Sequence, residues 1–365
     1  MPYGTLQIAD AFINEQRTIL QYGEVALYDN LVLPALARHE KWAQELTSLF
    51  CERSTDFLRG YGEVSDVENE EMGEQSRPDA SKAGRNTVNI GFPIRRYGSS
   101  VQWTRDYQRV TGVGEFAQQL DSHTNMDRRR IIWAIKKAIF TPTNNPNYKD
   151  TLPSRKTANI AIPLRAFYNA DGLLMPDGPN GEDFDPVTHT HYKGRAGGAL
   201  AASDVKALIS NVLEHDTEGQ IYLYINQAQE DAIRGMTGPG EFVPFVDARI
   251  RQAQDTIYAL GQGLNVQNSG DREIGIFGPA TVVVKPWMPA GYLYAADANG
   301  GKPLLYRIPE DDPTLGNFDV RATDEKYPLR ANTLARDFGV SVARRGKGAV
   351  LYIGGTTYVA PTLTV

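Results

Sequence analysis

The chain has 365 residues, of which 41% are hydrophobic and 10% aromatic, and this composition excludes a wholly disordered protein. Its formal net charge of −6 gives no general attraction to nucleic acid, so sequence-specific DNA reading is not expected. A single cysteine, Cys51, excludes an intramolecular disulfide and a CxxC metal motif, and no apolar run is long enough to predict a membrane-spanning helix.

The first fifty residues predict an arm followed by a helix. Periodicity is weak up to residue 30, whereas Leu36, Trp42 and Leu46 recur at helical spacing and predict a helix over residues 33–50. The N-terminal residues show no basic segment followed by an apolar run, so the sequence predicts no secretion signal. We therefore expect the protein to be made and kept in a cytoplasm.

A strand pattern follows a very polar stretch. In NTVNIGFPI the apolar residues alternate strictly with other residues, which predicts a strand with one apolar face: Val88, Ile90, Phe92 and Ile94. Residues 54–64 are the expected partner strand. We therefore predict a long β-hairpin over residues 53–104, whose tip is the polar stretch ENEEMGEQSRPDASKAGRN at 68–86.

A long helix is predicted over residues 114–141, where Pro142 ends it. Ile131, Ile135 and Ile139 form a stripe at the i, i+4 and i+8 positions of this helix, so they are expected to face the core.

The rest of the chain predicts mixed helices and strands. Residues 158–197 contain several turn signals and predict a β-rich insertion. Beyond it, helices are predicted over 201–216, 227–236 and 246–261, with strands at 221–226 and within 274–297. The final section predicts a hairpin that turns at Gly346 to Gly348. The expected fold class is α+β.

The strongest candidate for chemistry is THTHYKG, because His189 and His191 would face the same side of a strand and could hold a metal with Asp183 and Asp185. Two histidines in a polar turn are more often surface residues, and no second histidine cluster follows them. No phosphate-binding loop and no nucleophile elbow occur in the sequence. We therefore predict no enzymatic activity, no metal site and no cofactor.

The order of these elements resembles that of the major capsid protein of tailed bacteriophages, the Hong Kong 97-type fold. ALAASDVKALISNV and IYLYINQAQEDAIRGM resemble the first helix and the next strand-and-helix step of the family's axial domain. FGPATVVVKPWMPAGYLYAAD and DFGVSVARRGKGAVLYI resemble later passages and the terminal hairpin. The resemblance implies the following domains: an N-terminal arm and helix at 1–52, an E-loop at 53–104, a peripheral domain at 105–197 with a spine helix at 114–141 and the insertion at 158–197, an axial domain at 198–335, and a return to the peripheral domain at 336–365.

The same resemblance implies a structural protein that assembles with itself. Hexamers and pentamers would form an icosahedral phage head that encloses double-stranded DNA, located in the virion capsid and assembled in the host cytoplasm. Expected partners are other copies, a separate scaffolding protein, a portal, a decoration protein and, without sequence reading, the packaged DNA; no membrane is involved. Two alternatives stay open: an encapsulin-type nanocompartment shell, and a metal-dependent enzyme that uses His189 and His191.

The E-loop is the expected contact with a neighbouring subunit. Its apolar face would be partly buried there, through Val88, Ile90, Phe92 and Ile94. Its arginines would pair with acidic groups of the neighbour, namely Arg77, Arg85, Arg95 and Arg96.

Overall fold

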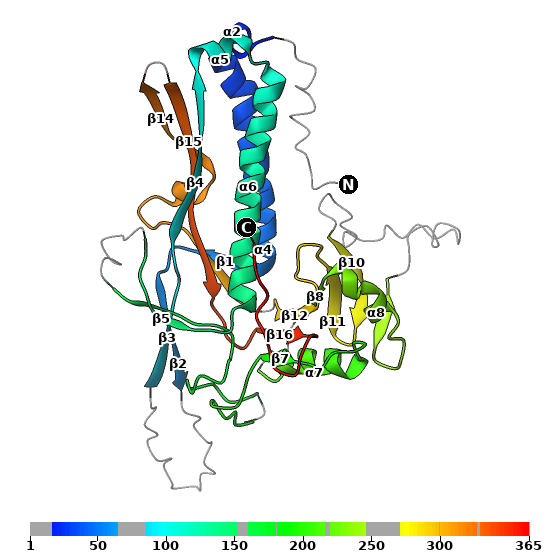
Figure 1. Cartoon of the computed structure of the whole chain (residues 1–365). Helices are drawn as coiled ribbons and strands as arrows, with labels where there is room; N and C mark the ends of the chain where they lie inside the picture. The colour runs from blue at the N-terminus through cyan, green and yellow to red at the C-terminus, as the bar shows by residue number, and fades with distance from the viewer. Residues whose placement is uncertain are drawn as a thin grey trace, which may run out of the picture.

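In the computed structural model, two long helices lie beside a sheet of long strands, a second sheet lies at one end of the helices, and a two-stranded ribbon projects from this body (Figure 1). This arrangement is the mixed α+β architecture that the sequence predicted. The structure describes residues 17–64, 85–151, 160–179, 181–215, 220–245, 271–298, 300–326 and 329–364. The predicted helix over 246–261 lies outside these residues.

The two long helices, α4 (Leu33–Phe50) and α6 (Val113–Phe140), run side by side (Figure 1) and match the predicted helices within one residue. The predicted stripe of α6, Ile131, Ile135 and Ile139, is completely buried. These residues pack with Leu46 and Phe50 of α4 in the largest apolar cluster, so burial of one face stabilises both helices. No helix among the described residues is long and apolar enough to cross a bilayer.

Short helical segments cover the far end of the helix pair, which is the end away from the second sheet (Figure 1). The segment before α4 forms α2 (Ile19–Tyr22), α3 (Glu24–Leu27) and a π-helical turn (Tyr28–Val32), and α5 (Arg105–Val110) packs against α2. The side chains of this segment that face inward belong to the same apolar cluster as the first turns of α6. The part of the predicted arm that the structure describes is therefore packed on its own chain.

The sheet of long strands has the order β1-β13-β15-β14, and β4 also pairs with β15. Its strands are β1 (Cys51–Ser54), β4 (Arg95–Thr104), β13 (Leu304–Arg307), β14 (Asp319–Lys326) and β15 (Leu329–Val342). β15 pairs antiparallel with β4 along ten residues, from Phe338 opposite Arg95 to Leu329 opposite Thr104. Residues 95–104 therefore belong to this sheet and not to the hairpin predicted over 53–104.

The second sheet has the order β7-β16-β12-β8-β11-β10-β9. Its strands are β7 (Tyr192–Gly194), β8 (Ile221–Ile225), β9 (Phe242–Pro244), β10 (Arg272–Phe277), β11 (Ala280–Val284), β12 (Tyr292–Asp297) and β16 (Gly348–Tyr352). α7 (Ala202–Leu213) packs against this sheet, with α8 (Glu230–Arg234), preceded by a 3₁₀ turn at Gln227–Gln229, nearby (Figure 1). The predicted strand at 221–226 and helices at 201–216 and 227–236 are confirmed, with shorter bounds.

The predicted terminal hairpin is wrong, because β15 and β16 lie in different sheets. The turn between them leads the chain from one sheet to the other. Arg345 in this turn is buried, and its Nε donates to the carbonyl of Ala166 at 2.8 Å. Its Nη2 lies 2.7 Å from the Asp171 carboxylate. These tertiary contacts determine the path of the turn, which the local alternation of apolar residues could not predict.

The insertion at 158–197 is not β-rich in its described part. It contains only β6 (Ile162–Leu164), which pairs with β5 (Asn145–Tyr148), and β7. At the predicted turn the chain bends at Gly172, which adopts a φ of 71° that favours glycine, and Asp171 Oδ1 accepts from the backbone N–H of Leu173 at 3.1 Å. Most of the segment is therefore loop whose position depends on side-chain contacts.

A buried polar network joins both long helices to the sheet of long strands. Arg336 of β15 is 1% exposed, and its guanidinium lies 3.0 Å from Asp127 of α6 and 2.8 Å from Glu40 of α4. It also donates to the carbonyl of Gly316, in a 3₁₀ turn at Pro313–Gly316, at 2.9 Å. His39 contacts the same Asp127 oxygen at 2.7 Å. One guanidinium therefore holds three elements that are far apart in the sequence.

Replacing this guanidinium is expected to destabilise the subunit strongly. Arg336→Met removes the only cation in the network that is paired with both carboxylates, which leaves buried acidic groups uncompensated and costs about 3–5 kcal/mol of unfolding free energy. Urea unfolding of the unassembled subunit, followed by circular dichroism, measures this loss. Arg38→Met, at an exposed position of α4, is the matched control and should change stability by less than about 0.5 kcal/mol. Equal effects of the two substitutions would contradict the role of Arg336.

Candidate assembly surface and histidine cluster

The predicted hairpin is present as a ribbon of two strands, β2 (Leu58–Val64) and β3 (Arg85–Gly91), which pair antiparallel with Leu58 opposite Gly91. Within the described residues no further strand pairs with either of them, and the ribbon points away from the body (Figure 1). The predicted tip lies outside the described residues. A two-stranded ribbon of this kind is marginally stable by itself, so its base must hold it.

The base of the ribbon is anchored by a buried ion pair. Arg307 of β13 contacts the Asp150 carboxylate at 2.8 Å, and the two side chains are 5% and 0% exposed. The same guanidinium donates to the carbonyl of Phe92 at 2.7 Å, and Asp150 accepts from the backbone N–H of Ile94 at 3.0 Å. The chain is thus attached to the body immediately after β3 ends.

The apolar side chains predicted to contact a neighbour mostly belong to the chain's own core. Ile90, Phe92 and Ile94 are 2%, 0% and 3% exposed, and the first two pack with Leu305 and Ala343. The prediction is wrong for these three residues, because a buried side chain has no surface left for a second chain. Val88, farther along the ribbon, is half-buried.

Two of the four predicted arginines are paired within the chain. Arg96 forms a two-bond ion pair with Asp337, with both distances 2.8 Å, and Arg95 donates to the Tyr148 hydroxyl at 3.0 Å. These hydrogen bonds raise the pKa of both guanidinium groups. Both arginines therefore have partners within the chain, but the Arg96 side chain is still 54% exposed, so pairing of Arg95 and Arg96 with a neighbour stays a prediction. Arg77 and the side chain of Arg85 lie outside the described part of the chain.

An exposed apolar surface, which we call the end surface, lies at the far end of the helix pair. It comprises residues of the segment before α4, the first residue of α4 and the last residue of α5, with exposed fractions between 39% and 79%: Leu20, Val25, Tyr28, Leu33 and Val110. Because α5 packs on α2, these residues come from adjoining elements (Figure 1). Exposed apolar side chains on adjoining elements favour contact with another protein surface where they lie together.

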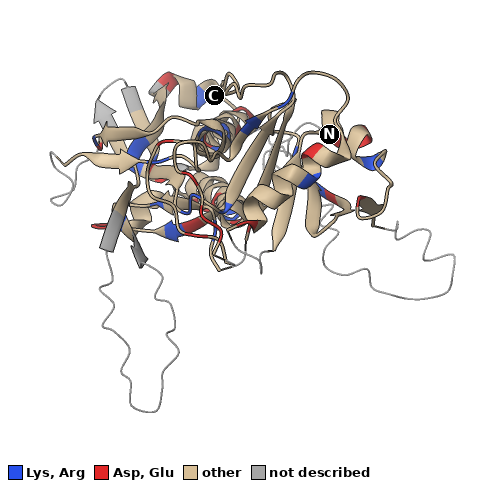
Figure 2. Ribbon diagram, turned by 90° about the horizontal axis from the view of Figure 1, so that it is seen from below, with Lys and Arg blue, Asp and Glu red and all other residues tan. Residues whose placement is uncertain are grey.

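Charged side chains give no comparable signal. In the view of Figure 2, acidic and basic residues are interspersed over the described part of the chain. Arg59 of β2, for example, lies 2.8 Å from Asp56 and 3.1 Å from Glu52.

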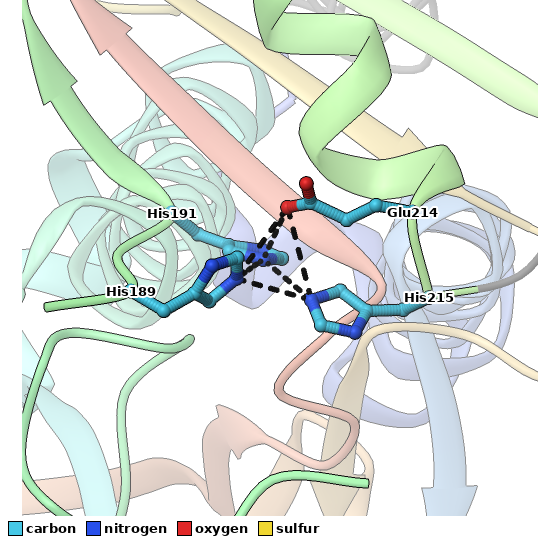
Figure 3. A group of neighbouring side chains, drawn as sticks. All are labelled: His189, His191, Glu214 and His215. Atoms are coloured by element: carbon cyan, nitrogen blue, oxygen red, sulfur yellow. Dashed lines mark hydrogen bonds and ion pairs between the residues drawn. The ribbon is translucent and has the colours of Figure 1, made fainter. Parts of the chain in front are cut away.

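A compact group of histidines lies between the insertion and the second sheet. The Nε2 atoms of His189, His191 and His215 are 3.0 to 3.2 Å from one another, and Oε1 of Glu214 is 3.4 to 3.9 Å from them. The four side chains point toward one another (Figure 3). The two later residues follow directly after α7, so the group joins that helix to the loop before β7.

Burial keeps these histidines uncharged. It lowers the pKa of His189, lowers that of the fully buried His191 further, and brings that of His215 to about 4. Burial also raises the pKa of the Glu214 carboxyl. At neutral pH the imidazoles therefore offer lone pairs that can bind a proton or a metal ion.

The expectation that His189 and His191 lie at the surface of a polar turn is wrong. His191 is completely buried, and Nδ1 of its ring donates to the carbonyl of Gly348 in β16 at 2.8 Å. Asp183 and Asp185, the acidic partners considered from the sequence, are not in the group. The Asp185 carboxylate instead accepts from Thr188 at 2.8 Å and stabilises an exposed turn.

Sequence reasoning missed Glu214 and His215. The adjacent pair Glu-His at the end of a predicted helix was the available signal. Its proximity to His189 depends on the loop path of the insertion, which no local pattern encodes.

No protein-family model and no curated protein matches the sequence. Solved structures do match it. A chain from Mycobacterium phage Patience has a TM-score of 0.68 at 21% identity, and the match covers 93% of this chain and 92% of that one. The capsid of Ralstonia phage GP4 has a TM-score of 0.47 at 9% identity, covering 86% and 88%. The holo-SrpI encapsulin complex from Synechococcus elongatus has a TM-score of 0.44 at 12% identity, covering 88% and 91%.

Of these three structures, the Patience chain alone has a TM-score above 0.5, and at 21% identity its similarity is one of fold. The match spans nearly the whole of both chains, so the helix pair, both sheets and the ribbon are compared together. The chain therefore shares its overall fold with the Patience phage chain.

Proposed function

We propose that this chain is the major capsid protein of a tailed bacteriophage, a structural protein without enzymatic activity. Copies would assemble into hexamers and pentamers of an icosahedral head that encloses double-stranded DNA. The observation that carries the proposal is the match to the Patience phage chain over 93% of this chain. The expected site is the virion capsid, after assembly in the host cytoplasm.

Two features of the subunit support assembly with other copies. The ribbon β2–β3 projects from the body and pairs with no other described strand, so it has two open edges and little core of its own. The end surface exposes apolar side chains that a neighbouring copy would cover. Both features gain stability on association, because contacts made only in the assembly stabilise the ordered form.

The corrected burial of the E-loop residues changes where the contact is expected. Ile90, Phe92 and Ile94 hold the base of the ribbon in its own subunit, so the contact with a neighbour falls on the distal part, beyond Val88. This division places the fixed base of the ribbon in its own subunit. A separate scaffolding protein, a portal, a decoration protein and DNA without sequence reading complete the proposed set of partners.

The proposed function predicts closed shells. The full chain, expressed with the proteins encoded next to it, should sediment as large particles and appear as hollow shells by negative-stain electron microscopy. Expression of the chain alone tests whether a scaffold is needed. A protein that stays monomeric under both conditions, at every concentration tested, would contradict the proposal.

Shortening the ribbon is expected to abolish assembly but not folding. Val64 and Arg85 are opposite each other in the pairing of β2 with β3, so residues 65–84 can be replaced by Asn-Gly, which closes a two-residue hairpin. The variant should keep the circular dichroism spectrum and thermal midpoint of the unassembled wild-type chain. It should form no normal shells by sedimentation, and normal shells would refute the role of the ribbon.

A charge in the end surface is expected to weaken assembly. Val110 is 79% exposed, so Val110→Asp should leave the subunit folded, but it places a carboxylate where a neighbour would bury apolar surface. The critical concentration for shell formation, measured by light scattering, should rise at least about tenfold for a penalty of about 1.4 kcal/mol. Val359→Asp, at a position 56% exposed near the C-terminus, is the control. No difference between the two variants would show that the end surface is not a contact.

A further inference from the structure

The histidine cluster described above has the composition of a metal site that the shell function does not require. Three of the chain's five histidines belong to it, and they come from two segments 24 or more residues apart. Their meeting at one point is a tertiary feature of the fold. The remaining member, Glu214, adds a carboxylate oxygen on the same side (Figure 3).

The spacing of the donor atoms fits a tetrahedral zinc ion. Zinc–nitrogen bonds of about 2.0–2.1 Å in tetrahedral geometry place the nitrogens about 3.3 Å apart. The three Nε2 atoms are 3.0, 3.1 and 3.2 Å apart, so each faces a common centre. Oε1 of Glu214 lies 3.4, 3.7 and 3.9 Å from the Nε2 atoms of His189, His191 and His215, close enough to supply a fourth ligand.

The orientation of His191 is fixed as a metal ligand requires. Its Nδ1–H donates to the Gly348 carbonyl at 2.8 Å, so Nε2 carries the lone pair that faces the other histidines. A backbone carbonyl that holds the second ring nitrogen is the usual support for a zinc-binding histidine. This support comes from β16, which ties the cluster to the second sheet.

Without a cation the group is poorly satisfied. Oε1 of Glu214 is a buried oxygen that has no hydrogen-bond donor among the described residues, although it points at three imidazole nitrogens. A divalent cation at the centre would satisfy the carboxylate and the three lone pairs together.

The surroundings favour a structural ion. Rings of Tyr168 and Phe184 pack on the histidines, with ring centres 4.6 to 5.9 Å apart. His191 is completely buried, and the side chain of His215 is 8% exposed. Four protein donors complete a tetrahedral zinc shell, which leaves no position for substrate. Imidazole donors also favour zinc over calcium or magnesium, which prefer oxygen ligands.

We propose that His189, His191, Glu214 and His215 bind one structural zinc ion, which attaches the loop before β7 to the end of α7 and to β16. The loop at 181–191 contains no strand of its own, and the ion would supply the order that a strand would otherwise give. This site is independent of the proposed capsid function, since it lies within one subunit.

Metal analysis of the purified chain tests the site directly. Full-length protein prepared without chelator, saturated with ZnCl₂ and desalted, should contain about one zinc ion per chain, measured by inductively coupled plasma mass spectrometry. His215→Ala should lose the zinc, and His123→Ala, which changes a histidine outside the cluster that contacts Ser99, should keep it. Zinc at background level in the wild type, or equal zinc in the His215→Ala protein, would overturn the proposal.

A conservative variant and a local readout exclude misfolding as the explanation. Glu214→Gln keeps the shape of the side chain but removes its charge. It should lower the affinity for zinc at least about 10-fold, which is the loss seen when a group that only hydrogen-bonds to a metal ligand is removed. In the wild type, removal of zinc by a chelator should raise hydrogen exchange in residues 181–191, while exchange in α6 stays constant and added zinc restores protection. Unchanged exchange in the loop, or unchanged affinity in Glu214→Gln, would contradict the site.

Discussion

The buried guanidinium of Arg336 is the interaction on which the rest of this subunit depends. It binds Asp127 of α6 and Glu40 of α4 at the same time, from a position in β15. Because charged groups are costly to bury unless they are paired, the three elements have one favourable relative position. The apolar stripe of α6 packs in that position, and β15 in turn carries the pairing with β4 that directs the chain into the ribbon.

The ribbon and the loop that carries the proposed zinc site are both segments with too little apolar core to be ordered by themselves. The ribbon is held at its base by Arg307 and Asp150, and its remaining stability is proposed to come from a neighbouring copy. The loop before β7 is held by side chains that converge on His191, and its remaining stability is proposed to come from a metal ion.

The features that sequence could predict were those with a local cause. α4 and α6 follow from helical spacing of apolar residues, and Ile135 faces the core as expected. The alternation around Phe92 indicated one buried face, but it could not tell whether the same chain or a neighbour buries it. The histidine cluster depends on the loop path that brings His189 to His215, and β15 separates from β16 because buried Arg345 directs the turn. Such contacts are tertiary and leave no periodic signal.

The central claim is that the projecting ribbon binds another copy of the chain in a closed shell. A cryo-electron microscopy reconstruction of the assembled particles measures this directly, since each subunit can be traced from β2 (Leu58–Val64) through to β3 (Arg85–Gly91). We expect the distal half of the ribbon to lie on a neighbouring subunit while Phe92 stays in its own core. A ribbon that contacts only its own subunit or solvent in such particles would contradict it.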